Sequence, residues 1–198
     1  MISLRRCLLC CLLCSLCALQ AWPAQAAFDV DALLASLATH PGGRMDFVET
    51  RHLAILDQPL VARGEMRYQP PQRLEKHTLS PQPESLVVDG NTLELVRGKQ
   101  TLSLQLDSRP ELIAFVDSIR ATLAGDRATL ERSYALLLSG TPAGWTLSLL
   151  PRDASISAFV LRIDLRGSGN QVSAIDYLQA DGDRTELRLS APAAATTP

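Results

Sequence analysis

The 198-residue chain is close to electrical balance, because 19 lysine and arginine residues stand against 21 aspartate and glutamate residues, and 46% of all residues are hydrophobic. This slightly acidic balance argues against nucleic acid or an anionic membrane surface as the main partner. The chain is long enough to bury the hydrophobic core of one ordinary domain.

Residues 1–26 have the pattern of a secretory signal peptide. Arg5 and Arg6 precede an apolar run, and Ala24 and Ala26 have the small-residue spacing of a signal peptidase site. The run contains all five cysteines of the chain, namely Cys7, Cys10, Cys11, Cys14 and Cys17. Their C-x-x-C spacing is that of metal sites, but the leucines between them predict an apolar helix in which thiolates do not converge. We therefore predict cleavage after Ala26 and export to the periplasm.

A lipid-anchored product is the alternative to a soluble one. Cys14 and Cys17 follow leucines, however, where lipid modification of a cysteine requires a small residue. The remaining residues, 27–190, contain no cysteine and are predicted to form one domain without disulfides. The alanine- and threonine-rich tail, 191–198, is predicted to be disordered.

The domain begins with a short amphipathic helix. In "FDVDALLASLATHPGG" the leucines recur at helical spacing, Asp29 can cap the first turn, and the segment from His40 to Gly43 ends the helix. From Arg44 onward apolar residues alternate with polar ones, and turn signals arrive every eight to twelve residues, which is typical of an antiparallel sheet. Tight hairpin turns are predicted at "DGN" (89–91) and "RGK" (97–99).

One helix interrupts the strands. It is predicted to begin at Pro110 and to end at Gly125, with an apolar stripe along one side. Strands resume at "SYALLLSG", "GWTLSLLP", "FVLRIDLRG", "QVSAIDYLQA" and "RTELRLS". The predicted fold class is α+β, mainly β, with two convincing helices to cover one antiparallel sheet.

The sequence contains no catalytic or metal-binding constellation, and we predict neither enzymatic activity nor a cofactor. His40, His52 and His77 have no second ligand at metal spacing. Ser168 lacks the G-x-S-x-G context of a nucleophile, and "ADGDR" is too short for a calcium loop. The apolar excess of the strands is consistent with either a hollow under a helical lid or a core filled by side chains.

Several segments, taken in order, resemble the periplasmic outer-membrane lipoprotein carrier family, LolA. They are the N-terminal helix leading into "MDFVET", then "GEMRYQPPQRLEK", "SLVVDGNTLELV", the central helix, "GWTLSLLP" and "YLQADGDRTELRL". The resemblance implies a curved antiparallel sheet that forms an incomplete barrel, with amphipathic helices as a lid. It also implies a carrier that binds acyl chains in an apolar cavity, takes them from an inner-membrane exporter and delivers them to an outer-membrane acceptor.

The chain departs from the family pattern at three positions. Pro70 stands before Pro71 where the family has an arginine that holds its lid closed, Lys76 replaces a tryptophan, and Glu94 replaces another aromatic residue. The chain also stops about where the family adds a further C-terminal segment. These departures indicate a divergent LolA-like carrier, which serves a lipoprotein or another acylated lipid.

We predict that apolar side chains of the strands line the cavity and that four residues of the central helix form the lid. The predicted cavity residues are Phe47, Met66, Leu93, Leu95, Leu102, Leu104, Trp145, Leu147, Phe159, Leu161 and Ile163, and the predicted lid residues are Leu112, Phe115, Val116 and Ile119. The carrier is predicted to be a monomer with acylated lipid or lipoprotein as cargo and no nucleic-acid partner. The alternatives are a periplasmic sensor or interaction domain of the same fold and an outer-membrane-anchored receptor.

Overall fold

The computed structural model describes residues 28–192 of the chain. The predicted signal peptide and residues 193–198 of the predicted tail lie outside the described residues. The helices are α2 (Val30–Ala38), the 3-10 helix η2 (Leu106–Ser108), α3 (Pro110–Ala124), α4 (Arg127–Ser133) and α5 (Ala154–Ser157). The strands are β1 (Gly43–His52), β2 (Leu60–Gln69), β3 (Arg73–Ser80), β4 (Glu84–Asp89), β5 (Thr92–Arg97), β6 (Gln100–Gln105), β7 (Tyr134–Thr141), β8 (Gly144–Pro151), β9 (Val160–Ser168), β10 (Gln171–Gln179) and β11 (Arg184–Ser190).

The described strands form one sheet of 11 strands in the order β6-β5-β4-β3-β2-β1-β11-β10-β9-β8-β7. Every neighbouring pair is antiparallel, and nearly every pair is joined by a short connection. The exception is the pairing of β1 with β11, which joins the first strand to the last. The sheet therefore has an N-terminal half, β1 to β6, and a C-terminal half, β7 to β11, that meet along one seam.

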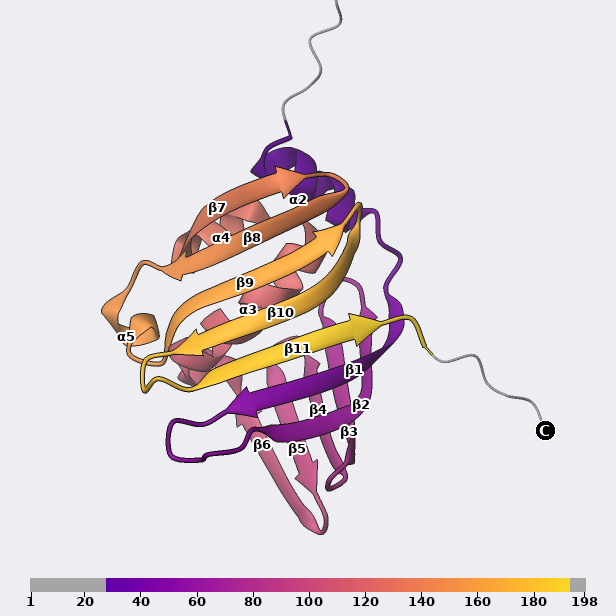
Figure 1. Ribbon diagram of the computed structural model, residues 1–198, viewed down its shortest axis with the longest axis vertical. Coiled ribbons are helices and arrows are strands. Elements are labelled where there is room, and N and C mark those ends of the chain that lie inside the picture. Colours follow the sequence, from indigo (N-terminus) through magenta and orange to yellow (C-terminus); the bar gives the residue numbers. More distant parts are fainter. Residues whose placement is uncertain (1–27, 193–198) are drawn as a thin grey trace, which may run out of the picture.

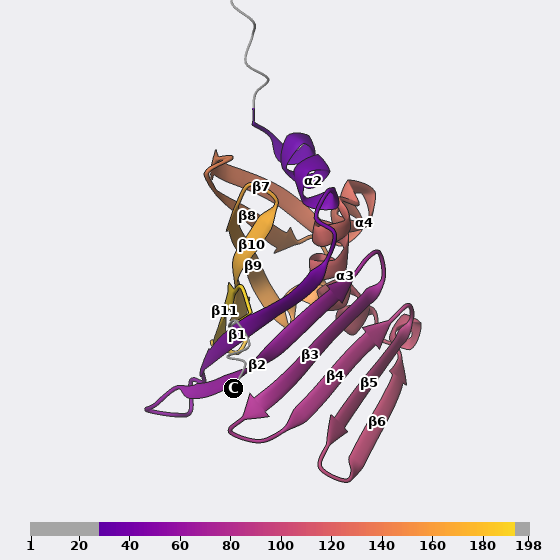
Figure 2. The ribbon, with the colours of Figure 1, turned by 90° about the vertical axis from the view of Figure 1, so that its right-hand side faces the viewer.

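The sheet bends at this seam, and helices α3 and α4 lie in the angle between the two halves (Figures 1 and 2). The sheet does not close into a barrel, because β6 and β7 are both edge strands. The predicted fold, a curved antiparallel sheet forming an incomplete barrel with covering helices, is confirmed.

The helix signals in the sequence act as predicted. Asp29 caps α2 by accepting a hydrogen bond of 2.9 Å from the amide of Ala32. Gly125 ends α3 in the left-handed conformation, with φ of 71°, as a glycine readily does. The predicted hairpin turns join β4 to β5 and β5 to β6, with Gly90 and Gly98 at positive φ. Local sequence therefore fixes where these elements begin and end.

Two α-helices and the 3-10 helix η2 were not predicted. Helix α4 follows α3 after one short turn and is capped by Asp126, whose carboxylate accepts from the amide of Thr129 at 3.0 Å. It buries only Leu130, so it has no apolar stripe to reveal it in the sequence. Helix α5 is a single turn that buries Ile156.

The strict alternation predicted for residues 159–165 is wrong at its start. Ile163 and Leu165 are fully buried as predicted, but Phe159 is 60% exposed and Leu161 is 47% exposed. The pairing of β9 with β10 shifts register between Leu178 and Gln179, which is an irregularity of the β-bulge kind. A bulge breaks the two-residue period, so side chains on either side of it no longer share one face.

Candidate functional site

The inner face of the C-terminal half is a closed core. Leu147, Leu149, Ile163 and Leu165, on the adjoining strands β8 and β9, are all fully buried. Trp145 belongs to the same buried cluster, and its indole N–H donates to the carbonyl of Gly169 at 3.0 Å. These central strands therefore supply stability, whereas Leu136 and Leu138, on the same face of the edge strand β7, are half-buried.

The inner face of the N-terminal half is only partly covered. The lower ends of β3 to β6 extend beyond the helices (Figures 1 and 2). Two rows of side chains cross these strands from neighbour to neighbour. The first row comprises Tyr68, Leu74, Val88, Leu93 and Leu104, and the second comprises Met45, Met66, Lys76, Leu86, Leu95 and Leu102.

Burial falls along both rows toward the edge strand. In the first row all residues are buried except Leu104, which is half-buried; in the second, Leu86 and Leu95 are half-buried and Leu102 is 49% exposed. Aliphatic side chains left in contact with water on a concave surface are the kind of surface that an apolar ligand can cover.

An apolar cavity of about 250 Å³ lies where the two halves of the sheet meet beneath α3. Its apolar lining comes from the starts of β1 and β3, the end of β2, the inner side of α3 and the strands beside the seam. These apolar residues are Met45, Met66, Tyr68, Leu74, Ile119, Leu123, Val172 and Leu189. Polar residues, including His40, Arg44 and Arg67, line the same cavity. The cavity suits a ligand with an apolar body and a polar end, because its hydrophobic lining lies next to a polar one.

Helix α3 covers the interior with the side chains that were predicted to form a lid. Val116 and Ile119 are buried, Leu112 is half-buried, and Phe115 is 37% exposed. The ring of Phe115 packs against Tyr177 of β10 with 4.9 Å between ring centres. The helix therefore contacts the C-terminal half through Phe115 and the cavity through Ile119.

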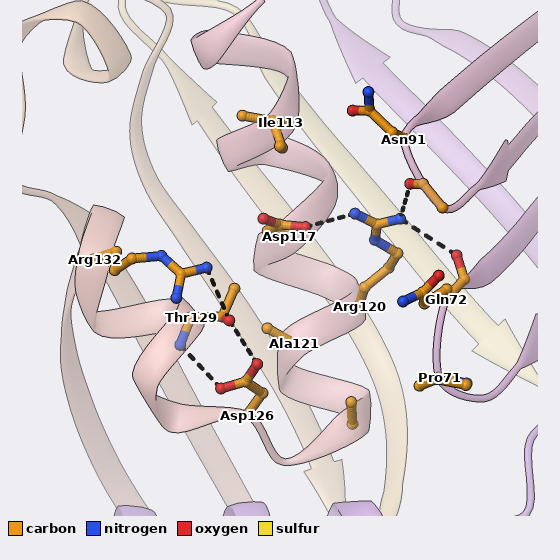
Figure 3. Close-up of a pocket in the computed structure, with 12 residues that line it drawn as sticks. Pro71, Gln72, Asn91, Ile113, Asp117, Arg120, Ala121, Asp126, Thr129 and Arg132 are labelled. Carbon is orange, nitrogen blue, oxygen red and sulfur yellow. Dashed lines mark hydrogen bonds and ion pairs between the residues drawn. The ribbon is translucent and has the colours of Figure 1, made fainter. Parts of the chain in front are cut away.

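A second, more open pocket of about 510 Å³ separates α3 and α4 from the turns that precede β3 and β5 (Figure 3). Arg120 of α3 crosses it, with its side chain only 13% exposed. Its guanidinium donates to the carbonyl of Gly90 at 2.5 Å and to that of Gln72 at 3.3 Å, and pairs with Asp117 at 2.7 Å. Arg120 thus ties the helix to two turns at the rim of the N-terminal half.

Charged residues also lie on the inner face. Glu49 of β1 is buried and accepts hydrogen bonds from Lys76 of β3 and, at 2.7 Å, from Arg51. Burial raises the pKa of the Glu49 carboxyl, but the charges and hydrogen bonds of Lys76 and Arg51 outweigh burial and hold that pKa below its ordinary value. Glu49 is therefore ionised at neutral pH, in the middle of a largely aliphatic surface.

Two tyrosines add polar groups to the interior. Burial raises the pKa of Tyr134 to about 12, with the charge of Asp117 adding to the effect. Burial also raises the pKa of Tyr177. Both phenols are therefore neutral hydroxyls at physiological pH. The buried hydroxyl of Tyr134 has no hydrogen-bond partner among the described residues.

The predicted cavity residues separate into three groups. Met66 lines the 250 Å³ cavity, and Phe47, Leu93, Leu95, Leu102 and Leu104 lie on the inner face of the N-terminal half. Trp145, Leu147 and Ile163 belong to the closed core, and Phe159 and Leu161 are exposed beyond the bulge. Met66 and the lid residue Ile119 line one cavity. The buried members of the first group and the three residues of the closed core belong to one continuous hydrophobic core.

Sequence reasoning missed the polar members of the inner face. Lys76 was noticed only as a replacement for an aromatic residue, and Glu49 and Arg120 were not singled out. The two-residue alternation in "DFVETR" and "LEKHTL" puts Glu49 and Lys76 in phase with apolar neighbours, which is the one local signal that could have revealed them.

The described residues offer no support for metal chemistry or for a membrane-crossing helix. No group of three or more His, Cys, Asp and Glu side chains within residues 28–192 is arranged to hold a metal ion. In the same part of the chain, none of the helices combines the length and the apolar character that crossing a bilayer requires.

Comparison with known proteins decides the family. The family described as "Outer membrane lipoprotein carrier protein LolA-like" matches residues 22–198. The chain belongs to the LolA-like family. A search of curated proteins finds no match to its sequence.

Solved structures similar to this LolA-like chain are distant in sequence. A LolA superfamily protein from Nitrosomonas europaea is 11% identical, with a TM-score of 0.47 over 87% of this chain and 96% of that one. MucB is 17% identical, with a TM-score of 0.47 over 86% of this chain and 59% of that one. A putative outer membrane lipoprotein-sorting protein domain from Vibrio parahaemolyticus is 9% identical, with a TM-score of 0.44 over 85% of this chain and 92% of that one.

Among the family departures, only Lys76 lies on the inner face of this LolA-like chain. Glu94 is exposed and pairs with Val87 and Ser103 on the outer face. Pro70 lies in the turn after β2, where the family arginine is missing. Arg120 of α3 donates to the carbonyl of Gln72, two residues after Pro70, so a guanidinium joins α3 to this turn.

Proposed function

We propose that this protein is a non-catalytic periplasmic carrier that binds the acyl chains of a lipoprotein or another lipid and ferries them toward the outer membrane. The observation that carries the proposal is the partly covered aliphatic inner face of β3 to β6, next to an apolar cavity beneath α3. Family membership supports it, because the family is described by lipoprotein carriage.

The energetics favour an acyl ligand. Each CH₂ group removed from water contributes about 0.8 kcal/mol, so a long chain gains on the order of 10 kcal/mol if it is fully covered. The half-exposed leucines of the second row gain in the same way when the chain covers them. Because these leucines are only partly buried without ligand, the surface can bind the acyl chain and release it again.

Movement of α3 is the step that would admit the chain. The helix is held at one side by Arg120 and at the other by the contact of Phe115 with Tyr177. Val116, Ile119 and Ala121 of α3 also pack into the hydrophobic core, so the helix must withdraw these side chains to admit the chain. We infer that the carrier acts as a monomer between an inner-membrane exporter and an outer-membrane acceptor.

Displacement of the neutral fluorescent probe N-phenyl-1-naphthylamine by long-chain lipids tests the proposal. The purified protein should bind the probe saturably, and Leu95→Asp should weaken binding at least tenfold because it puts a charge on the inner face. Leu137→Asp is the matched control, since Leu137 is exposed on the outer face of β7 and pairs with Ser148. Absence of saturable binding, together with absence of lipid in gently extracted protein by mass spectrometry, would contradict carriage.

A domain that binds a protein partner is the second candidate, and one observation favours it. The loop between β1 and β2 projects from the molecule (Figures 1 and 2), and it exposes Ile55 and Leu56, next to the exposed Leu60 at the start of β2. Exposed aliphatic groups on a projecting loop are typical of interaction surfaces. A chain that fails to bind the probe but loses a partner in the Ile55→Asp variant would have this second function.

A further inference from the structure

Lys76 interrupts a row of aliphatic side chains. Its neighbours across β2 and β4 are Met66 and Leu86, and the row continues to Met45 on one side and to Leu95 and Leu102 on the other. The lysine side chain is 17% exposed, so water still reaches it at the centre of this row. A cation in an otherwise apolar row is costly unless something compensates its charge.

A glycine lets the ring of Phe47 lie close to the strands beside Lys76. A Cβ atom at Gly64 would lie 2.0 Å from the carbonyl oxygen of His77 and 2.9 Å from the ring of Phe47, so no other residue fits there. The Phe47 ring packs over the glycine, and the Lys76 ammonium lies 5.1 Å from the centre of this ring. Beyond the ring, the ammonium donates to Glu49 across β2.

The charges around Lys76 do not balance. Glu49 is the carboxylate that both Lys76 and Arg51 bond, so this cluster of three residues has one positive charge in excess. An ammonium has three N–H donors, and Glu49 is the only hydrogen-bond acceptor that the described residues provide for that of Lys76. The cluster can therefore bind one anionic group without losing a bond that it already makes.

A purely structural ion pair is the competing explanation. Replacing a buried ion pair with well-packed apolar residues is often neutral or stabilising, so the pair is weak evidence for a stabilising role. The aliphatic residues on both sides of Lys76 make such a replacement simple at this position. The partial exposure of the ammonium and the excess charge both favour a role toward a ligand.

We propose that Lys76 binds the anionic group, a carboxylate or a phosphate, of an amphiphilic lipid whose chain lies along the row of Met66, Leu86 and Leu95. The inference rests on the proposed carrier function and specifies its ligand. Arg51 and Glu49 position the ammonium, and the apolar row holds the chain. A lipid with a neutral head group leaves the excess charge uncompensated and binds less tightly.

Binding of cis-parinaric acid and of its methyl ester, measured by fluorescence at neutral pH, tests this inference. The two probes share one chain and differ in charge. The protein should bind the acid roughly tenfold more tightly than the ester, which is the ratio that one charge-assisted hydrogen bond provides. Lys76→Met should lower the affinity for the acid to that for the ester and leave ester binding within about twofold. Lys99→Met makes the same change in the exposed turn before β6 and should alter neither affinity.

Glu49→Gln separates a ligand site from a structural pair. This change removes the negative charge beside Lys76 and keeps a hydrogen-bond acceptor for it, so it should raise the affinity for the acid and not that for the ester, whereas a structural role predicts equal weakening of both. Displacement of the acid by oleate and by oleoyl lysophosphatidate then distinguishes a carboxylate source from a phosphate source.

Three results would overturn the inference. Equal binding of acid and ester by the unchanged protein, or equal weakening of both by Lys76→Met, refutes charge recognition and leaves the carrier function intact. Failure of the protein to bind either probe refutes the carrier function as well.

Discussion

The two halves of the sheet have the same alternation of side chains but opposite degrees of cover. In the C-terminal half, Leu147, Leu149, Ile163 and Leu165 of β8 and β9 are fully buried. In the N-terminal half, the leucines of β4 to β6 become more exposed toward the edge strand, and a charged cluster interrupts them. One sheet thus contains both a core that stabilises the fold and a surface that is available to a ligand.

The difference comes from the helices rather than from the strands. Helices α2, α3 and α4 contact one another and lie against the C-terminal half, and Asp31 of α2 pairs with Arg127 of α4 at 2.8 Å. Helix α3 also reaches the N-terminal half, through Arg120 at its rim and through Ile119, which lines the cavity with Met66. The helices thus cover strands β8 and β9 more completely than the strands β5 and β6.

The largest effect that would test this comparison is on stability. Leu147→Ala should lower the free energy of unfolding by about 3 kcal/mol, because it leaves a cavity in a closed core. Leu102→Ala, the same change at a side chain that is 49% exposed, should cost less than about 1 kcal/mol. Urea denaturation measures both. If the two variants lost equal free energy of unfolding, the two halves would be equally packed and the comparison would fail.

A smaller effect is expected at the rim. Arg120→Gln removes the charged hydrogen bonds to the carbonyls of Gln72 and Gly90 and should cost about 2 kcal/mol. Amide hydrogen exchange should become faster in α3 and in the two turns, and remain slow in β8 and β9. Arg109→Gln, at an exposed arginine before α3, is the control. Faster exchange throughout the sheet would mean that α3 is part of one cooperative core.

The smallest effect is dependent on pH. Because the pKa of Glu49 is lowered in the folded protein, its ionised form stabilises the fold above the ordinary carboxyl range, and this stabilisation is lost as the pH falls through the folded-state pKa. Glu49→Gln should therefore be less stable than the unchanged protein by about 1 kcal/mol at neutral pH. The difference should disappear in acid, as thermal denaturation between neutral pH and about pH 3 can measure. If the difference in stability between the two proteins did not change with pH, ionisation of Glu49 would be excluded as its cause.

Much of the fold could be predicted from local sequence. The helix from Pro110 to Gly125 and the hairpin turns at Gly90 and Gly98 depend on signals a few residues long. The exposure of Phe159 and Leu161 could not be predicted, because a bulge in β9 depends on its pairing with β10. Helix α4 could not be predicted from an apolar stripe, because it buries a single leucine.

The site was less predictable than the fold. Phe47, Met66 and Leu95 could be chosen by alternation alone, but alternation does not say which half of the sheet the helices cover. The contact between Glu49 and Lys76 spans three strands, so no sequence spacing encodes it. The role of Arg120 could not be predicted either. The family pattern places an arginine in the turn after β2, whereas Arg120 lies in α3.

The pairing of β1 with β11 has a consequence for how the chain folds. Strands β1 to β6 can pair one after another as they emerge during synthesis, because each contact is local. The seam, by contrast, cannot form until the last strand is present, and bringing the two ends together costs loop-closure entropy. We therefore expect completion of the seam to be the slow step, and the unpaired edge of β1 to be the segment that most needs a chaperone while the chain is incomplete.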